Sequence, residues 1–258
     1  MGDEGRLYVA EEIVPAYKEM IRHADLIVPN CFEAELLSGV KITDMKSLVL
    51  AITRLHKLYQ VPNVIVTSLR IDQASGQRRP SNQEGTIAVV GSTSRHDLSP
   101  RIFQVTVPSL PIFFSGTGDM FAALMVVRLR EAVLEDPEVL KTASWRSPDG
   151  VTATQLPLAK ATEKTLASMH AILMKTSRAR DEEIQARRSS VIGNSEGEDK
   201  EKKLHLLQTR ASEVRVVRYV EDLRKPKLEG LSVDFKAEAV NIEVHDDDEE
   251  VQKPFGEA

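Results

Sequence analysis

Four consecutive residues, Gly116-Thr117-Gly118-Asp119, interrupt an apolar run and have the types needed for phosphate chemistry. Apolar residues resume directly after them at helical spacing, so the pattern predicts a helix that begins at this turn. Two glycines let a backbone approach a ligand closely, and the first N–H groups of a helix, with its dipole, attract an anion such as phosphate. A carboxylate beside that phosphate would serve as the base that accepts a proton from an attacking hydroxyl.

The same turn has a plainer interpretation, in which Thr117 or Asp119 only caps the helix. Glycines are common near helix caps, so these four residues taken alone favour the capping interpretation over the catalytic one. The choice between them depends on the elements that must position the turn.

Helices and strands alternate ahead of the turn. The predicted elements are helices over residues 11–24, 31–38 and 44–59 and strands over residues 25–30 and 63–68. Gly39 is expected to close the second helix, and Thr43 is expected to cap the third. This alternation indicates a parallel α/β sheet with helical crossovers.

Two more strands are predicted between this region and the turn, over residues 86–92 and 101–109, and they are expected to pair antiparallel. The polar stretch 72–85 before them is expected to be a loop. Because the chain begins with helix-like residues, the expected sheet has few strands and looks incomplete at its N-terminal side.

The region beyond the turn divides into a long helix and two further segments. Helical spacing continues over residues 158–178, whereas residues 179–203 are charged and poor in aromatic residues and are expected to be a disordered linker. Residues 204–258 form a C-terminal appendix with expected strands at 204–208 and 240–244, and its acidic run 246–250 is expected to be a solvated tail.

Composition excludes several classes of protein. The 258 residues carry a formal net charge of -5 with interspersed basic residues, which disfavours nucleic-acid binding, and they include 41% hydrophobic residues, enough for a core. No stretch is apolar enough for a membrane span, and we expect a cytosolic protein. The single cysteine, Cys31, excludes an intrachain disulfide and is expected to fill a small buried space, and the six histidines show no pair at metal-ligand spacing.

Three stretches, "VPNCFEAELLSGVKI", "VIVTS" and "FFSGTGDMFAALM", closely resemble, in this order and at these separations, the pyridoxal kinase family of the ribokinase superfamily. The Asn-x-x-Glu of Asn30 to Glu33 and the Gly-Thr-Gly-Asp of Gly116 to Asp119 correspond to that superfamily's two signatures. The resemblance covers residues 1–178, which it implies are the C-terminal part of a ribokinase-like α/β domain with a mostly parallel sheet flanked by helices. Family members carry further strands and most of the vitamin pocket ahead of the position of Met1, so the sheet is expected to be incomplete.

The resemblance implies a role for each residue of the turn. Asp119 matches the catalytic base, which takes the proton of the 5′-hydroxymethyl group of pyridoxal as that oxygen attacks the γ-phosphate of ATP. The N–H groups of Gly116, Thr117 and Gly118 match those that hold the transferred phosphoryl group.

Outside the turn, the resemblance implies a nucleotide and metal site. Thr67 and Ser68 match positions that line the nucleotide site, and Asn30 and Glu33 match groups that order magnesium and its waters. Asp3 and Glu4 match a pair that contacts metal ions beside the phosphates, although an acidic and frayed chain end explains them equally well. Phe113 and Phe114 could flank the adenine, but phenylalanines of this kind are more often core residues.

The implied cofactors are ATP, Mg²⁺ and a monovalent cation such as K⁺, and Val28 departs from the threonine that many members place near that cation. The implied partners are pyridoxal or related B6 vitamers and, for the full-length family, a second copy in a homodimer, in the cytosol and also the nucleus. Two alternatives stay open: a nucleotide-binding or interaction fragment with weak catalysis, and a related hydroxymethylpyrimidine-type kinase.

Overall fold

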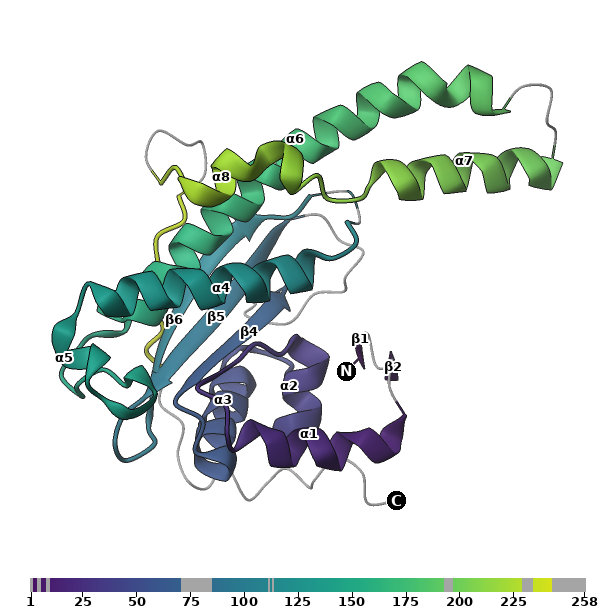
Figure 1. Cartoon of the computed structure of the whole chain (residues 1–258). Coiled ribbons are helices and arrows are strands. Elements are labelled where there is room, and N and C mark those ends of the chain that lie inside the picture. The colour runs from purple at the N-terminus through teal and green to yellow at the C-terminus, as the bar shows by residue number, and fades with distance from the viewer. Residues whose placement is uncertain are drawn as a thin grey trace. The chain divides into compact units, whose positions relative to one another are not determined.

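The computed structural model describes residues 2–3, 6–7, 10–70, 85–110, 112, 114–192, 197–228 and 234–242 (Figure 1). Contacts within the chain divide it into two units, and each is described by itself. Unit 1 comprises Met1–Ser109, Arg128–Glu163 and Val233–Ala258, and unit 2 comprises Leu110–Val127 and Lys164–Ser232. The helices α4 (Thr117–Leu134) and α6 (Pro157–Ile192) each contribute residues to both units.

Unit 1 contains all the strands of the described residues. Besides its shares of α4 and α6, its elements are β1 (Gly2–Asp3), β2 (Arg6–Leu7), η1 (Glu11–Ile13), α1 (Val14–Ile21), β3 (Leu26–Ile27), α2 (Cys31–Ser38), α3 (Met45–Tyr59), β4 (Asn63–Leu69), β5 (Thr86–Ser94), β6 (Pro100–Pro108), α5 (Pro137–Leu140), η2 (Ala143–Trp145), η3 (Ala153–Gln155) and β7 (Glu238–Ala239). The predicted order of helices and strands from α1 to β6 is confirmed, whereas β1 and β2 were not predicted.

Five strands form one sheet in the order β3-β4-β5-β6-β7. Strands β3 and β4 are parallel, whereas the pairs β4–β5, β5–β6 and β6–β7 are antiparallel. The prediction of a mostly parallel sheet is therefore wrong for the described strands, and the sheet is mixed. Helices α2 and α3 make the crossover that a parallel pair needs, but only residues 95–99 join β5 to β6, which is too few for anything except antiparallel pairing.

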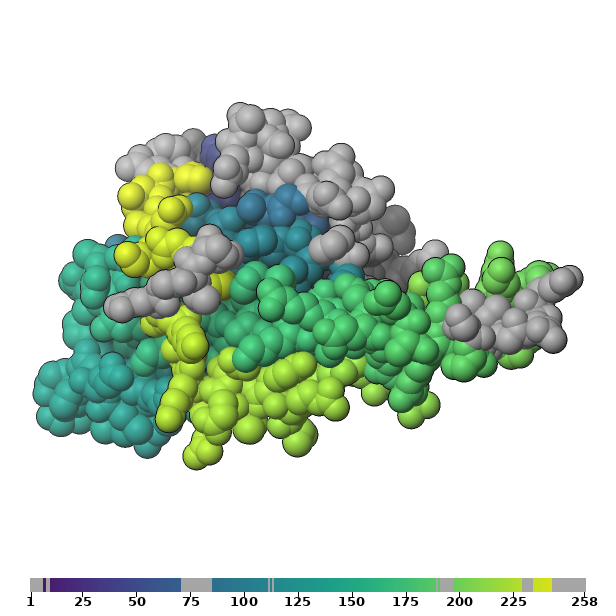
Figure 2. Space-filling model, turned by 90° about the horizontal axis from the view of Figure 1, so that it is seen from above, coloured from purple at the N-terminus to yellow at the C-terminus, as the bar shows by residue number. Residues whose placement is uncertain are grey.

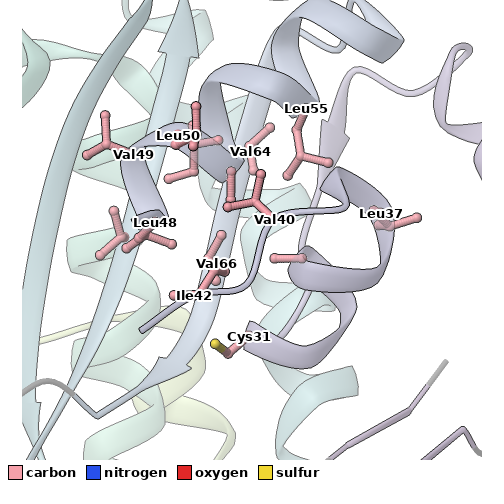
Figure 3. Close-up of a cluster of buried hydrophobic side chains, with 14 of the residues drawn as sticks. Cys31, Leu37, Val40, Ile42, Leu48, Val49, Leu50, Leu55, Val64 and Val66 are labelled. Carbon is pink, nitrogen blue, oxygen red and sulfur yellow. The ribbon is translucent and has the colours of Figure 1, made fainter. Parts of the chain in front are cut away.

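One face of the sheet packs against α2 and α3 (Figure 3). Val64 and Val66 of β4 point toward this face because alternate residues of a strand share a side, and Val90 and Ile102 extend the face onto β5 and β6. The helical and connecting residues of this cluster that Figure 3 labels are Cys31, Leu37, Val40, Ile42, Leu48, Val49, Leu50 and Leu55. Each fully buried aliphatic side chain stabilises the fold by about 1.5–3 kcal/mol, so this cluster fixes the position of α2 against β4.

On the opposite face of the sheet, an aromatic ring lies close to the backbone of Gly91. Gly91 is paired with Ile65 on one side and Phe103 on the other, and the Phe103 ring lies over it. A Cβ atom at Gly91 would lie 2.3 Å from Cζ of Phe103. Only glycine leaves room for this buried ring.

Local caps set the bounds of α2 and α3. Gly39 ends α2 with a φ of 71°, as predicted. The cap of α3 is Asp44 rather than the predicted Thr43: the Asp44 carboxylate accepts a hydrogen bond from the Ser47 N–H at 2.8 Å, and the Ser47 hydroxyl accepts one from the Asp44 N–H at 3.0 Å. Hydrogen bonding from the backbone and hydroxyl of Ser47 lowers the pKa of Asp44, so the carboxylate form stabilises this helix start.

Unit 2 consists of helices. Besides its shares of α4 and α6, it contains α7 (Gly197–Ala211), η4 (Val217–Tyr219) and α8 (Val220–Arg224). The segment that follows α7 lies along α6 (Figure 2), where Arg215 pairs with Glu183 at 2.6 Å and Lys175 pairs with Asp222 at 2.6 Å.

The structure differs from two predictions in this region. Residues 179–203 were expected to be disordered, but α6 continues through Ile192 and α7 begins at Gly197. Residues 204–208 were expected to form a strand, but they lie inside α7. The predicted appendix does contribute a strand, β7, which pairs with β6 slightly ahead of the predicted position 240–244. The expected loop 72–85, except Gly85, and the acidic run 246–250 lie outside the described residues.

Within the described part of the chain, no helix is both long enough and apolar enough to cross a lipid bilayer.

Candidate nucleotide and phosphoryl-transfer site

The turn before α4 has the backbone geometry of an anion site. Gly116 has a φ of 80°, in the left-handed region that favours glycine, and α4 begins at the next residue. The Met120 N–H donates to the Gly116 carbonyl at 3.0 Å, which is the first hydrogen bond of the helix. The N–H groups of Thr117, Gly118 and Asp119 precede this bond, so they have no acceptor within the helix and are able to bind a ligand.

The side chains of this turn leave its surface open. Asp119 and Gly118 are exposed, and Thr117 is half-buried. A Cβ atom at Gly118 would meet nothing within 4 Å, and the same holds at Gly116. At Gly118, therefore, the packing of the described chain does not explain why the residue is glycine.

The capping interpretation of Thr117 and Asp119 is not supported by the geometry. Gly116 occupies the N-cap position because its carbonyl accepts the first helical hydrogen bond. Among the described residues, neither the Thr117 hydroxyl nor the Asp119 carboxylate has a hydrogen-bond partner. The Asp119 carboxylate is thus an exposed anion in the first turn of α4, where the helix dipole favours negative charge.

Asn30 and Glu33, at the start of α2, hold each other in a capping box. The Asn30 side-chain oxygen accepts a hydrogen bond from the Glu33 N–H at 2.9 Å, and Oε2 of Glu33 accepts one from the Asn30 N–H at 3.0 Å. The spacing of the Asn-x-x-Glu motif therefore has a structural role, because it satisfies two backbone donors at the helix start. Sequence reasoning assigned these residues to magnesium and missed this role.

The end of β4 lies beside this capping box. Thr67 forms an isolated parallel bridge with Asn30, and the Thr67 N–H donates to the Pro29 carbonyl at 3.0 Å. Ser68, the next residue, has a φ of 61°, and the pairing of β4 with β5 shifts register between Val66 and Leu69. Left-handed backbone costs a non-glycine residue about 1–2 kcal/mol, and bulges of this kind are frequent beside active sites. Sequence analysis chose Thr67 and Ser68 but gave no sign of this strained bulge.

The metal candidates are described only in part. Asp3 lies in β1, which contacts α2, but its side chain and all of Glu4 lie outside the described residues. The described residues contain no group of three or more His, Cys, Asp or Glu side chains that could hold a metal ion on their own. Oxygen ligands such as the Glu33 carboxylate suit Mg²⁺, which usually binds through one or two carboxylates together with substrate phosphates.

The structure brings together only some of the predicted site residues. Asn30, Glu33, Thr67 and Ser68 gather at one edge of the sheet in unit 1, and residues 116–119 form their own turn in unit 2. Cys31 is buried at 4% exposure, as predicted, and Phe114 is a buried core residue at 5% exposure. Phe113 lies outside the described residues.

Comparisons with known proteins point to one family. Residues 1–132 match the family model described as phosphomethylpyrimidine kinase. The human pyridoxal kinase is 30% identical over 178 residues, which cover 67% of this chain and 47% of that protein. The pyridoxal kinase of Dictyostelium discoideum is 36% identical over 131 residues, which cover 49% of this chain and 40% of that protein. The chain spans about half the length of these curated relatives and of others that it matches.

Solved structures share the fold. Pyridoxal kinase from Leishmania donovani, in complex with ADP and pyridoxamine, superposes with a TM-score of 0.60 at 24% identity, over 93% of this chain and 60% of that one. The Plasmodium falciparum PdxK with AMP-PNP and PL gives a TM-score of 0.58 at 20% identity, over 93% of this chain and 58% of that one. On these matches, and with both superfamily signatures in place, the chain belongs to the pyridoxal kinase family.

Proposed function

We propose that this chain binds ATP and serves in the phosphorylation of the 5′-hydroxymethyl group of pyridoxal. The observation that carries the proposal is the start of α4, where Gly116 and Gly118 leave open space around three helix N–H groups and Asp119 is exposed beside them. The names of the relatives support a pyridoxal-type substrate.

The open turn supports phosphate binding. Charge grows on the transferred phosphoryl oxygens in the transition state, and backbone N–H groups aimed at that position stabilise the charge without reorganising. Two of the N–H groups that have no acceptor within the helix, those of Thr117 and Gly118, hold this phosphoryl group together with the N–H of Gly116, the residue before the helix. Gly118 would permit a closer approach of the phosphate than any residue with a side chain.

Asp119 is the group that accepts the proton. A carboxylate repels a triphosphate, so its presence in a phosphate site needs a chemical reason, and proton transfer from the attacking hydroxyl supplies one. As the hydroxyl oxygen bonds to the γ-phosphorus and the bond to the β-phosphate oxygen breaks, the hydroxyl proton passes to the Asp119 carboxylate.

The remaining residues serve the nucleotide and its metal. Thr67 and Ser68 line the nucleotide site at the end of β4, where open α/β sheets bind ligands. Glu33, with Asp3 and Glu4, would hold Mg²⁺, whose positive charge would offset the charge that develops on the phosphates. Asn30 orients Glu33 through the capping box and would order the metal's waters. A monovalent cation such as K⁺ also belongs to the proposal.

A kinase assay tests the proposal. We expect the purified chain with Mg²⁺ and labelled ATP to transfer phosphate to pyridoxal at a very low rate, but in preference to hydroxymethylpyrimidine, and the Asp119→Asn variant to lose this transfer. Preference for the pyrimidine would retain the kinase and change its substrate, as the description of the family model allows. Binding of MgATP without transfer would reduce the function to a nucleotide-binding module, and a folded chain that binds no ATP would refute both.

A further inference from the structure

A second polar site lies in unit 1 around the turn that joins β5 to β6. Its centre is Arg101, which is only 3% exposed. Register places Thr93 and Ser94 beside Asn63, at the start of β4, whereas Thr67 and Ser68 end that strand. At about 3.3 Å per residue, these two ends of β4 are roughly 15 Å apart, so this site is separate from the end of β4 assigned to the nucleotide.

Arg101 holds the loop of residues 147–151 against the ends of β5 and β6. Its Nε donates to the Thr93 carbonyl at 3.3 Å, and its Nη1 donates to the carbonyls of Pro148 and Val151 at 2.6 and 3.2 Å. Its Nη2 donates to the carbonyls of Ser94 and Ser147 at 3.2 and 3.0 Å. All five N–H groups of the guanidinium are thus used, and no carboxylate accepts from any of them.

Three buried polar atoms beside Arg101 have no hydrogen-bond partner among the described residues: the hydroxyls of Ser94 and Ser147 and Nε of Arg146. Ser94 is 0% exposed and Ser147 is 1% exposed. One nitrogen, Nη2 of Arg101, binds the carbonyls of both serines, and Ser147 follows Arg146 in the chain, so all three groups belong to one location. Buried donors without an acceptor cost about 1–3 kcal/mol each, which favours a bound acceptor here.

Two of the three groups, Ser94 and Arg146, lie toward the same side of the sheet. Ser94 lies two residues after Ser92 on β5 and therefore faces the same side of the sheet. On that side, the Ser92 hydroxyl bonds to Nε2 of His56 at 2.9 Å. Desolvation is the main cause that lowers the pKa of His56 to about 4, and the charge of Arg146 lowers it further, which places the Arg146 guanidinium near the same side.

Positive charge dominates this location. Burial and the charges of Arg95 and Arg146 lower the pKa of Arg101, and the charge of Asp149 opposes this shift. Asp149 and Asp97 are the neighbouring acids, and both are exposed. Asp149 accepts from the N–H and Nδ1 of His96, and Asp97 accepts from Ser99. No hydrogen bond joins either carboxylate to these arginines among the described residues, but the charge of Arg95 acts on Asp97 and that of Arg101 acts on Asp149. Three guanidinium groups thus stand against two exposed carboxylates, which leaves an excess of one positive charge.

We propose that Ser94, Ser147 and Arg146 form a binding site for a small inorganic anion, a halide such as chloride, which locks the 147–151 loop onto the sheet. Two hydroxyl donors and one charged N–H donor suit an anion that accepts in every direction. The enclosure of all three donors favours a monatomic ion over phosphate. The excess of positive charge favours an anion over a neutral water.

The segment of residues 144–147, which supplies Arg146 and Ser147, is held in one conformation. Ser144 and Trp145 have φ values of 54° and 52°, and Arg130 of α4 stacks over the Trp145 ring at 5.2 Å. Two successive left-handed residues persist only where the surroundings enforce them. A bound halide beside Ser147 would be one such enforcing contact.

Crystallography with bromide tests the position of the ion. Crystals of the full chain soaked in sodium bromide should show an anomalous peak within hydrogen-bond reach of the Ser94 and Ser147 hydroxyls and Nε of Arg146. Electron density there without an anomalous signal would identify a water and overturn the proposal. Bromide found only at exposed positions would overturn it as well.

Thermal unfolding tests the contribution of each donor. At equal ionic strength, replacing sodium gluconate by sodium chloride should raise Tm by about 2–5 °C, because a ligand that binds only the native state stabilises it. Ser147→Ala and Arg146→Gln should each lose most of this increment. The matched controls Ser190→Ala and Arg188→Gln change exposed residues of α6 and should keep it.

The serine variant also separates the proposal from its alternative. If the Ser147 hydroxyl is simply unsatisfied, Ser147→Ala removes a desolvation cost and should raise Tm equally in both salts. That result, or an equal chloride increment in all four variants, would overturn the halide site. Circular dichroism of each variant at 25 °C shows whether the comparison is made between folded proteins.

Discussion

Asp119 is a charged residue whose position the fold does not require, because Gly116 already provides the N-cap of α4 and the Asp119 carboxylate has no partner among the described residues. Its contribution to stability is limited to the favourable interaction of a carboxylate with a helix N-terminus, about 0.3–1 kcal/mol. Stability and catalysis can therefore be separated by substitution at this residue.

We expect Asp119→Asn to lower kcat by about 10²–10⁴, the usual effect of losing a general acid or base, while ATP affinity stays equal or improves. Asparagine keeps the size of the side chain but cannot accept the hydroxyl proton, and the loss of charge relieves repulsion of the triphosphate. Steady-state kinetics and calorimetry check the two effects. Unchanged turnover per folded molecule, with a lower Tm, would show that Asp119 only stabilises the helix.

Gly118 gives the complementary test of the turn. Because a Cβ atom there meets nothing within 4 Å, Gly118→Ala should raise the free energy of unfolding by up to about 1 kcal/mol, the helix preference of alanine over glycine. The methyl group would crowd a bound phosphate, and overpacking of about 1–3 kcal/mol corresponds to a 5- to 150-fold loss of ATP affinity. Urea unfolding and ATP titration measure the two quantities. A variant that binds ATP normally would show that the phosphate does not bind at this turn.

At the scale of elements, the apolar pattern was sufficient to predict α1, α2, α3, β4, β5 and β6, because each buries one face against the same sheet. The antiparallel pairing of β5 and β6 was predicted and is confirmed. The direction of β5 relative to β4 was not predicted, since it depends on how the chain returns between them. The prediction of a disordered linker also failed, for residues 179–192 and 197–203, which are helical. Their charges suggested disorder, but Glu183 pairs with Arg215, a residue distant in sequence, and such pairs are invisible to composition.

Only the sequence motifs of the candidate site could be predicted from the sequence. The glycines of the turn and the Asn-x-x-Glu spacing are visible in the sequence, and the structure gives each a defined geometry. The bulge at Ser68 was not predictable, because a serine in a β-branched run carries no signal for a φ of 61°. Tertiary pairing with β5, not local preference, holds that residue in its strained conformation.

Helix α3 is joined to the sheet by His56, and this contact should make stability depend on pH. Nδ1 of His56 donates to the Val61 carbonyl at 2.7 Å, so Nε2 accepts from the Ser92 hydroxyl, and the buried ring is neutral. Its pKa falls from 6.5 to about 4 in the folded chain, mainly through desolvation. The stabilisation is fully present above pH 6.5 and is lost as pH falls toward 4, by roughly 3 kcal/mol in total.

Urea unfolding between pH 7.5 and pH 4.5 measures this loss. We expect the free energy of unfolding to fall faster with decreasing pH for the wild-type chain than for His56→Gln, which has no proton to gain. The variant His96→Gln changes an exposed histidine and should keep the wild-type slope. Parallel slopes for the wild type and His56→Gln would show that protonation of the His56 ring does not cause the loss of stability at low pH.

The hairpin of β5 and β6 depends in the same way on Arg101. We expect Arg101→Lys to lower the free energy of unfolding by about 3 kcal/mol or more, because one ammonium group cannot reach the carbonyls of residues 93, 94, 147, 148 and 151 together, and those left buried lose their donors. Arg95→Lys, at a half-buried position on the same turn, serves as the control and should cost far less. Equal losses in the two variants would mean that charge, rather than the fork geometry of Arg101, holds the loop.

At the scale of the whole molecule, the assigned residues fall in two units, and half the length of the relatives lies outside the matched region. Nucleotide binding is the part of the proposed function that we assign to these residues. Vitamin binding and full turnover depend on residues that this chain has not been shown to supply. The sharpest global test is therefore the effect of ATP on the stability of the chain.

We expect MgATP at 100 times its Kd to stabilise the folded chain by about 2.7 kcal/mol, which corresponds to a rise in Tm of roughly 5–10 °C. The rise should grow with the logarithm of the ATP concentration, because only the native chain binds the ligand, and it should shrink in EDTA, because Mg²⁺ offsets repulsion between the triphosphate and the acidic groups of the site. Asp119→Asn should keep the rise and Gly118→Ala should lose most of it. If the rise in Tm is independent of Mg²⁺ and is the same in both variants, ATP binds elsewhere on the molecule. The start of α4 would then not be the phosphate site.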